Sequence, residues 1–320
     1  MRRIIIAGAL VVVAFAIVLY SRNNGVLPTH TVLAYQFKSG NEATYDVALV
    51  VTNTVQSGAS AAPSITKVNV ATHEKVLSTD AHGATVRVTV EQPSVQVDGK
   101  TMQASTLRIN TAELQINNDG HVEKVRFPGV GASTPISVTT SGGKNDAIQL
   151  GSTSGRSSAE PLQNLLTMVQ ASLPSFPTGG KGDKNDVNVG QAWQRSSVIN
   201  APYMVLEAAM ANSKLDGFEQ QNELRVARIV TQASTPVDVQ TYQPNGAALR
   251  VKGAQDLRMT AYFVPSLGGV IRVNGTGHVD LAQQFASASA PKKTGRLTVT
   301  QTPAHTVTDL SFTATLRQQQ

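Results

Sequence analysis

Residues 257–263 read LRMTAYF, and this stretch decides the fold class. Its apolar side chains stand at every second position, which is the period of a β-strand with one buried and one hydrated face. These residues are Leu257, Met259, Ala261 and Phe263. A helix would instead repeat its apolar residues every three or four positions. We therefore expect an antiparallel strand here.

The same alternation recurs in both directions along the chain. Residues 86–90 read VRVTV, and residues 310–316 read LSFTATL. Each stretch is rich in Val, Thr, Leu or Phe, which favour extended backbone. The pattern predicts a mainly β protein built from two antiparallel β-sheet halves.

Two dipeptides mark tight turns between such stretches. Asp98-Gly99 and Asp119-Gly120 are typical of two-residue hairpin loops, whose central residues need positive φ. With Asp119-Gly120 as a two-residue loop, three cross-strand pairs follow, and each joins compatible side chains. They are Leu114 with Val125, Ala112 with Phe127, and Glu113 with Arg126.

One stretch between the halves predicts a helix. From Ser158 to Leu173, apolar residues recur at helical spacing, and Pro161 fits the first turn. Pro202 to Asn212 is compatible with either a helix or a long strand. We divide the chain into a membrane anchor and tether (1–24), a first β-rich half (25–150), a linker with a helix at about 158–173 (151–188), and a second β-rich half (189–320).

Short echoes between the halves suggest a diverged duplication. Gly40 with Tyr45 opens the first half, and Gly190 with Trp193 opens the second. The pattern Gly-His-Val-acid occurs at 120–123 and again at 277–280. The alternative is that glycine before a strand is common turn chemistry.

The N-terminus predicts a membrane-spanning helix. The run from Ile4 to Tyr20 is uncharged, follows Arg2 and Arg3, and precedes Arg22. Basic residues before an apolar run favour a cytoplasmic N-terminus, and Tyr20 suits the membrane interface. We predict a single-pass signal anchor in the cell membrane with the C-terminal domain outside the cytoplasm. A cleaved signal peptide and a buried core helix are the alternatives.

Charge supports this division of the chain. The net charge is +6, but three of the basic residues belong to the N-terminal segment, which leaves +3 on the rest. Charged residues make up 15% of the sequence, against roughly a quarter in ordinary domains. No basic face interleaved with aromatics is visible, so we expect no nucleic-acid partner. The chain has no cysteine, which excludes disulfides and a lipid-modified cysteine.

Motifs for catalysis or metal binding are absent from the sequence. Gly99-Lys100-Thr101 lacks the upstream glycine of a phosphate-binding loop, and the centre of the GSTSG run is Thr153 where a nucleophile elbow needs serine. The six histidines form no ligand pair, and we expect each at a strand end or turn. Trp193 is either a core residue or, with Tyr203, the wall of a groove. We therefore nominate no catalytic, cofactor-binding or metal-binding residue.

Three short motifs resemble a known family. Residues 37–47 read FKSGNEATYDV, residues 187–193 read VNVGQAW, and residues 214–230 read KLDGFEQQNELRVARIV. They resemble bacterial envelope proteins of the DUF6263 type, which are β-rich and lipoprotein-like. This chain departs from them by lacking a lipobox cysteine. The resemblance implies a β-rich fold at the cell envelope, and it brings no catalytic residues.

Three functions are compatible with these features. The first is a non-enzymatic, membrane-anchored extracytoplasmic domain that binds a hydrophobic or amphipathic ligand, such as a lipid, between curved sheets. The second is a structural component that meets another envelope protein. The third is a hydrolase without a recognisable motif. Low charge and long alternating strands favour the first.

Overall fold

Every element that the structure describes is a β-strand, as the alternating pattern predicted. The computed structural model describes residues 29–56, 63–102, 111–126, 128, 136–137, 174–177, 185–201, 204–221, 223–242, 248–286 and 303–319. The strands are β1 (His30–Val32), β2 (Glu42–Gln56), β3 (Pro63–Thr79), β4 (Gly83–Val90), β5 (Ser94–Val97), β6 (Lys100–Met102), β7 (Thr111–Asn117), β8 (Val122–Arg126), β9 (Ile136–Ser137), β10 (Asp186–Asn188), β11 (Ala192–Ala201), β12 (Met204–Gln221), β13 (Leu224–Tyr242), β14 (Ala248–Val264), β15 (Gly269–Ala286) and β16 (Pro303–Gln319).

The two halves of the chain join in one antiparallel sheet of 14 strands. Strands β11 to β16 follow one another as a meander, and β2, β3, β4, β7, β8 and β9 continue the sheet. The remaining two strands, β5 and β6, form a hairpin in which β5 pairs with β3. The link between the halves is the pairing of β16 with β2, which runs from His305↔Gln56 to Gln319↔Ala43. The sequence left open whether the halves share one sheet, and this ladder shows that they do.

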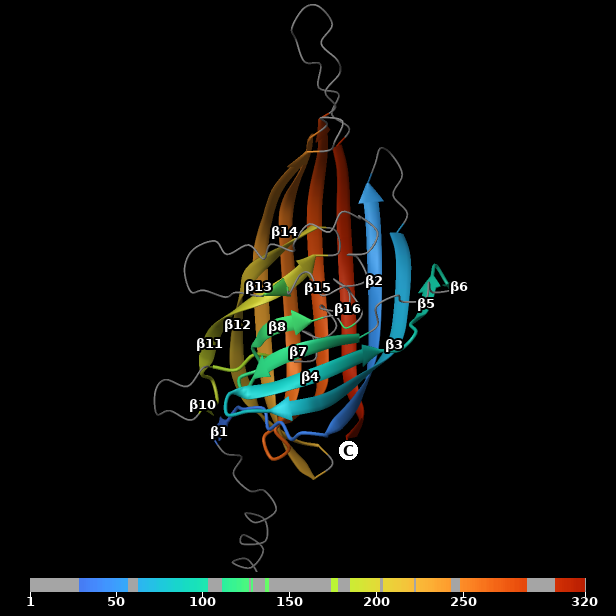
Figure 1. Ribbon diagram of the computed structural model, residues 1–320. Coiled ribbons are helices and arrows are strands. Elements are labelled where there is room, and N and C mark those ends of the chain that lie inside the picture. Colours follow the sequence, from blue (N-terminus) through green and yellow to red (C-terminus); the bar gives the residue numbers. More distant parts are fainter. Residues whose placement is uncertain are drawn as a thin grey trace, which may run out of the picture.

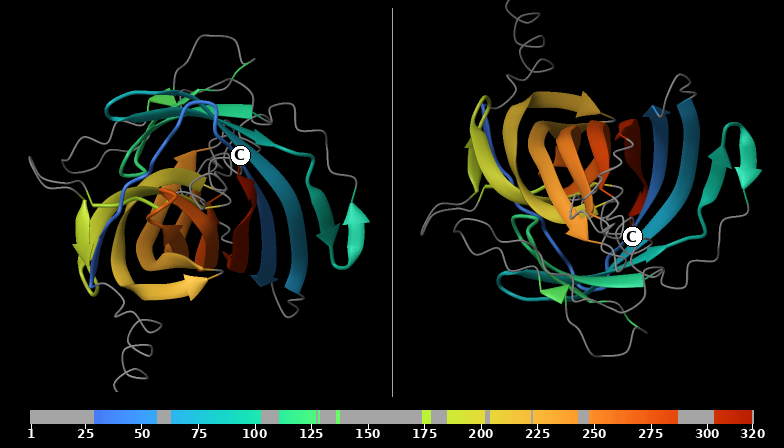
Figure 2. Two further views of the ribbon diagram at one scale, coloured as in Figure 1. Left: turned by 90° about the horizontal axis from the view of Figure 1, so that it is seen from below. Right: turned by 90° about the horizontal axis from the view of Figure 1, so that it is seen from above.

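The large sheet curves strongly, so that its two ends come in front of its long central strands. In Figure 1, β4 and β7 lie across the lower part of β13 to β16, and β11 closes from the other side. Figure 2 shows the same curvature from below and from above. A second, two-stranded sheet pairs β1 with β10.

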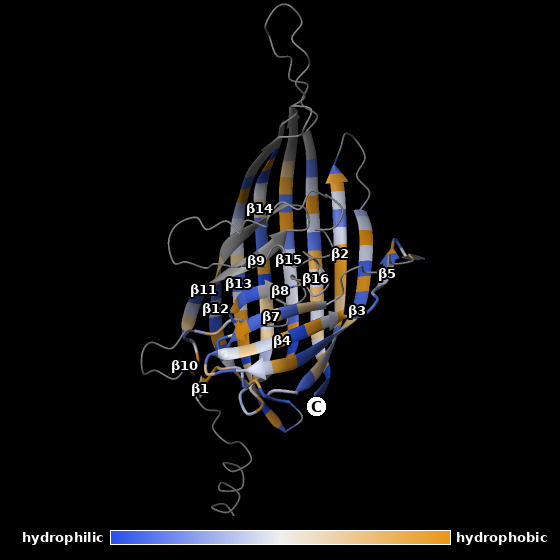
Figure 3. Ribbon diagram, in the orientation of Figure 1, coloured by the Kyte–Doolittle hydropathy of each residue, from blue (hydrophilic) through white to orange (hydrophobic). Residues whose placement is uncertain are grey.

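Each long strand has an inner face, toward β4 and β7, and an outer face toward solvent. On β14 the inner residues Ala261 and Phe263 are buried, whereas the outer residues Asp256 and Arg258 are exposed. The same rule holds on β4, where Val86, Val88 and Val90 are all buried. The predicted alternation is therefore confirmed, and it is visible as alternating bands of hydropathy along the strands in Figure 3.

The ambiguous segment from Pro202 to Asn212 is a strand from residue 204 onward. It forms the first part of β12, which pairs with β11 on one side and β13 on the other. Helical propensity at Leu206, Glu207 and Ala208 is overridden because this part of β12 pairs with β11, and from Ala211 onward β12 pairs with β13 as well.

Both predicted hairpins exist, but one has a longer loop than expected. Asp98 and Gly99 have φ values of 50° and 80°, and they join β5 to β6 as a two-residue turn. In the second hairpin the predicted pairs Glu113↔Arg126 and Leu114↔Val125 are confirmed. The prediction of a two-residue loop at Asp119-Gly120 is wrong. A bulge shifts the register after Gln115, β7 ends at Asn117 and β8 begins at Val122, so residues 118–121 form the loop.

One of the two echoes between the halves corresponds to a repeated structure. Gly40 and Gly190 both have φ of 87°. Gly40 N donates to Val76 O and Gly190 N donates to Leu215 O, at 2.8 and 2.7 Å. In each case a bulge follows at once in the partner strand, after Val76 in β3 and after Leu215 in β12. The same turn and bulge therefore open both halves.

The second repeated motif, Gly-His-Val-acid, occurs in two different structural settings. Gly120 has φ of 81° and lies in the loop between β7 and β8, whereas Gly277 lies within β15. The Gly-His pairs at 120–121 and 277–278 therefore occupy different environments. Their likeness in sequence reflects no common position in the fold.

Several predictions fall on residues outside those that the structure describes. The membrane anchor, with Arg2, Arg3, Ile4 and Tyr20, is one of them, and the helix at about 158–173 is another. Both stay predictions. The described residues contain no helix that is long and apolar enough to cross a membrane.

Candidate functional site on the inner face of the sheet

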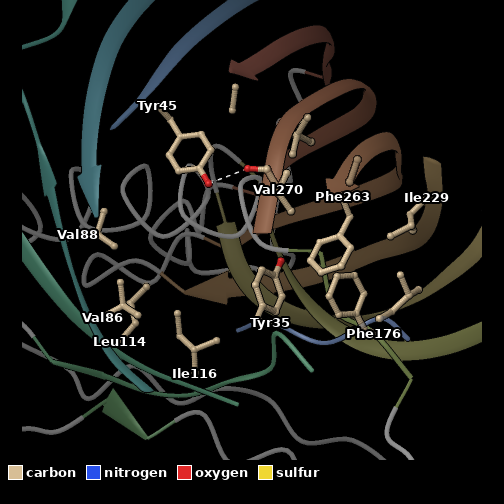
Figure 4. Close-up of a cluster of buried hydrophobic side chains, with 14 of the residues drawn as sticks. Tyr35, Tyr45, Val86, Val88, Leu114, Ile116, Phe176, Ile229, Phe263 and Val270 are labelled. Atoms are coloured by element: carbon tan, nitrogen blue, oxygen red, sulfur yellow. Dashed lines mark hydrogen bonds between the residues drawn. The ribbon is translucent and has the colours of Figure 1, made fainter. Parts of the chain in front are cut away.

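The lower end of the inner face is closed by an aromatic cluster. Tyr35 stacks on Phe37 and Phe176, and Phe176 meets Phe263 edge-on with ring centroids 4.7 Å apart. Phe176 and Phe263 are both fully buried. Figure 4 shows the rings of Tyr35, Phe176 and Phe263 together, with Leu114, Ile116, Val86 and Val88 on the side of Tyr35 away from the two phenylalanines. The layer of β4 and β7 therefore seals this end with a packed core.

Two buried tyrosines satisfy their hydroxyl groups within this core. Tyr45 Oη donates to Val270 O at 2.9 Å, which Figure 4 marks as a dashed line. Tyr35 Oη donates to Pro174 O at 3.1 Å. Burial raises the pKa of both phenols well above the ordinary value, because the charged form would lose its hydration. Both groups act as neutral hydrogen-bond donors.

The short segment 174–177 is clamped between the two halves. Phe176 N donates to Asp119 O at 2.6 Å, and Arg195 Nε donates to Phe176 O at 2.9 Å. Arg195 also forms an ion pair with the buried Asp119 carboxylate. Trp193 Nε1 donates to Ser175 O at 3.1 Å. Part of the predicted linker thus ties the β7–β8 loop to β11.

Trp193 belongs to this core. Trp193 is 9% exposed, and its indole nitrogen donates a hydrogen bond to the carbonyl of Ser175. Of the two alternatives for this tryptophan, the core is therefore correct. Tyr203, the other aromatic considered for a groove, lies outside the described residues.

Above this core, the inner face continues along the long strands and stays apolar. The side chains there are partly exposed and share two neighbouring cross-strand rows on β14, β16 and β2. They are Leu49, Val51, Leu257, Met259, Leu310 and Phe312. Within each row a glycine of β15, Gly277 or Gly275, stands between the β14 residue and the β16 residue. The Phe312 ring lies where a Cβ on Gly275 would stand. We call this set the apolar patch.

One row of neutral polar residues crosses the inner face above the apolar patch. Register places Thr235 beside Gln255, and Val279 beside both Gln255 and Thr308. Thr308 then pairs with Asn53, to which its hydroxyl donates at 3.3 Å. We call Thr235, Gln255, Thr308 and Asn53 the polar band. Sequence reasoning missed it, although the break in alternating hydrophobicity at Gln255 was a signal.

The polar band holds hydrogen-bonding capacity that the described residues leave unused. Gln255 is 6% exposed and Thr308 is 3% exposed. The Thr235 hydroxyl oxygen is buried without a hydrogen-bond partner. Apolar residues return on the far side of the band, where Val251, Val279 and Leu281 form a second small cluster. Polar groups are thus enclosed between two apolar zones.

The outer face of the long strands carries charged side chains that their inner face lacks around the polar band. A shallow groove of about 610 Å³ crosses β12 to β16, and Gln232, Asp256 and Arg258 line it. His278 Nδ1 lies 2.7 Å from Asp309 Oδ1 in the same groove. This hydrogen bond is the main cause that raises the pKa of His278, and the charges of Asp309, Asp280 and Asp256 add to it. The groove is open to solvent.

The histidines are not all where the sequence placed them. His30, His82 and His121 lie at a strand start or in turns, as expected, and His305 lies near the start of β16. His73 and His278 lie within strands, which corrects the prediction for these two. Each sits on an exposed face and is held by a carboxylate, His73 by Glu91 at 2.7 Å. Among the described residues, no group of side chains could hold a metal ion.

No family model matches this chain, and no curated protein matches it either. The resemblance to DUF6263 proteins therefore stays a prediction.

Three solved structures align over most of the chain at low similarity. A structure on lipid–protein interactions in lipovitellin aligns with 89% of this chain at 8% identity and a TM-score of 0.46, and this chain spans only 26% of that one. A DUF1329 family protein from Desulfovibrio piger covers 83% of this chain and 84% of its own, at 9% identity and a TM-score of 0.21. Pseudomonas aeruginosa OccK2 (OpdF) in complex with glucuronate covers 87% and 97%, at 7% identity and 0.21. At these scores the likenesses establish no shared fold.

Proposed function

We propose that this protein binds a hydrophobic or amphipathic ligand against the inner face of its sheet and performs no catalysis. The observation that carries the proposal is the apolar patch. Its six side chains adjoin one another on three strands and remain partly exposed. Contiguous exposed apolar surface on the concave side of a sheet is typical of ligand sites.

The chemistry of the patch fits a lipid tail better than a polar substrate. The patch itself contains only Leu, Val, Met and Phe, and removing their surface from water contributes about 25 cal/mol for each Å². Met259 adds an adaptable packing surface for a flexible chain, and Phe312 adds a large rigid apolar ring. The predicted N-terminal anchor would hold the domain beside a membrane, which is a source of such ligands.

Binding of the fluorescent apolar probe N-phenyl-1-naphthylamine tests the proposal. We expect saturable binding to the full chain, and about tenfold weaker binding in Met259→Gln, because a buried methionine contributes roughly 1.5 kcal/mol or more. Arg258→Gln is the matched control, since its side chain is the next along β14 and faces outward.

The two variants separate the faces of one strand. Weakening by Met259→Gln alone supports binding on the inner face. Equal binding by the two variants, or no saturable binding by the parent protein, would refute the proposal. Far-UV circular dichroism and the Trp193 emission spectrum show whether each variant is folded.

A further inference from the structure

The polar band sits where a ligand on the apolar patch would place its polar group. Thr235, Gln255, Thr308 and Asn53 lie in one cross-strand row, which extends over about 19 Å if neighbouring strands are ~4.8 Å apart. From Gln255 to Met259, β14 rises about 14 Å at ~3.4 Å per residue. One leaflet of a membrane, half of a ~30 Å hydrocarbon core, has nearly this thickness. A single acyl chain therefore fits between the polar band and the lower edge of the apolar patch.

Along β13 to β16 and β2, the described inner positions around the polar band carry no charge that could neutralise a charged head group, and Arg195 on β11 is already paired with Asp119. From the lower row of the apolar patch through the row beyond the polar band, the inner positions of β13 to β16 and β2 carry no Asp, Glu, Lys or Arg. These positions are the odd-numbered residues of 231–237, 253–259, 275–281 and 49–55 and the even-numbered residues of 306–312. Charged side chains in the same segments, such as Arg258 and Asp309, face outward.

Because Gln255 and Thr308 are buried, the absence of a counter-ion beside them disfavours a ligand with a charged head group. A phosphate or carboxylate beside Gln255 and Thr308 would be taken from water without a counter-ion, which is strongly unfavourable. An ester or hydroxyl group requires only neutral hydrogen bonds. The amide of Gln255 can donate and accept, and the unpaired hydroxyl of Thr235 can do the same.

We infer that the ligand is an uncharged lipid of the acylglycerol class, whose ester and hydroxyl groups bind the polar band while its acyl chain lies on the apolar patch. The inference rests on the proposed function and adds the chemical class of the ligand. The acyl chain runs along β14 and β16 against Leu257, Met259 and Leu310. The glycerol end is held at Gln255 and Thr235.

Two lipids that differ only by a phosphate test the inference. Monoolein and oleoyl lysophosphatidic acid share one acyl chain and one glycerol ester. Each is used, below its micelle concentration, to displace N-phenyl-1-naphthylamine from the full chain. We expect monoolein to displace the probe at a concentration at least about tenfold lower, because the phosphate would be buried unpaired.

A variant in the polar band links this preference to its residues. Gln255→Leu is expected to lower the affinity for monoolein about fivefold, because one neutral hydrogen bond to the lipid is lost. The affinity for the probe should stay unchanged. Gln232→Leu makes the same substitution on the outer face of β13 and should change neither.

The outcomes separate the two proposals. If the probe does not bind the parent protein, the proposed function fails and the inference fails with it. If the probe binds but lysophosphatidic acid displaces it as well as monoolein does, or better, only the inference is overturned. Equal monoolein affinity in Gln255→Leu and the parent protein would also overturn it.

Discussion

Side chains on the inner face of the sheet pack in the core, whereas those on the outer face form exposed charged pairs. On the inner face Phe176 contributes a ring to the core although it belongs to a segment that the sequence assigns to a linker. No periodicity surrounds it, so only its contacts with Tyr35 and Phe263 reveal its role. On the outer face, His278 and Asp309 form an exposed pair that alternation alone would leave as solvated polar residues.

The His278–Asp309 pair predicts a pH-dependent contribution to stability. The carboxylate raises the pKa of His278 above its ordinary value, so the stabilisation is fully present below about pH 6.5 and is lost as the pH rises through the folded-state pKa. Asp309→Asn should therefore lower the titration midpoint of His278 in NMR spectra. It should also destabilise the protein more at pH 5 than at pH 8.

Asp238→Asn is the matched control on the same face. Asp238 pairs with Arg250, whose pKa is raised further, and the pKa of Asp238 itself is lowered by that arginine. Both groups remain charged at pH 5 and pH 8, so the cost of this variant should be similar at the two values. An unchanged His278 midpoint in Asp309→Asn would show that the hydrogen bond does not hold in solution.

At the scale of elements, the repeated turn at Gly40 and Gly190 is the clearest case in which sequence and structure agree. Each glycine adopts a positive φ that directs its N–H to the partner strand just before a bulge. The β7–β8 loop is the opposite case. Its Asp119 carbonyl accepts from Phe176 N and its carboxylate pairs with Arg195, so distant partners shape the loop that the Asp-Gly dipeptide suggested would be tighter.

Alanine substitution at the two repeated glycines measures the cost of this turn. A Cβ at Gly40 or at Gly190 has nothing within 4 Å, so the cost comes from φ alone. We expect each variant to lose about 1 kcal/mol of unfolding free energy in urea titrations, the typical penalty for L-residues in this region. The two losses should be similar because the turns are alike.

Gly269 provides the comparison. A Cβ there also has open space, and its φ is ordinary. Gly269→Ala should be neutral or slightly stabilising, because alanine restricts the unfolded chain. A loss at Gly269 equal to that at Gly190 would mean that backbone conformation is not the cause.

For the whole molecule, the pairing of β16 with β2 joins the two halves in one sheet. The largest core cluster contains Leu114 and Val88 from the first half together with Trp193 and Ile229 from the second. Because these residues share one buried volume, loss of packing in one half should weaken the other. The local sequence pattern could not reveal this shared core, because both halves have the same alternation of apolar and polar residues.

Leu114→Ala tests the unity of the core. Leu114 is fully buried on β7, so its truncation should cost about 2–5 kcal/mol. The only tryptophan, Trp193, reports from the other half. We expect urea unfolding followed by Trp193 fluorescence and by circular dichroism to shift together to lower urea. A shift in circular dichroism with an unmoved Trp193 transition would show two independently folding halves.

The amino-acid sequence by itself determined the β class and, in stretches such as 86–90, 257–263 and 310–316, which side of the strand is apolar, because the period of two is a local property of the extended backbone. The hairpin at Asp98-Gly99 followed for the same reason. Only the tertiary structure decided that β16 pairs with β2, because backbone hydrogen bonds between strands carry no residue code. It also decided the cross-strand register, and register alone places Thr235, Gln255, Thr308 and Asn53 in one row. The low charge of the chain is thus partitioned, with charged side chains on the outer face and neutral ones where a ligand would lie.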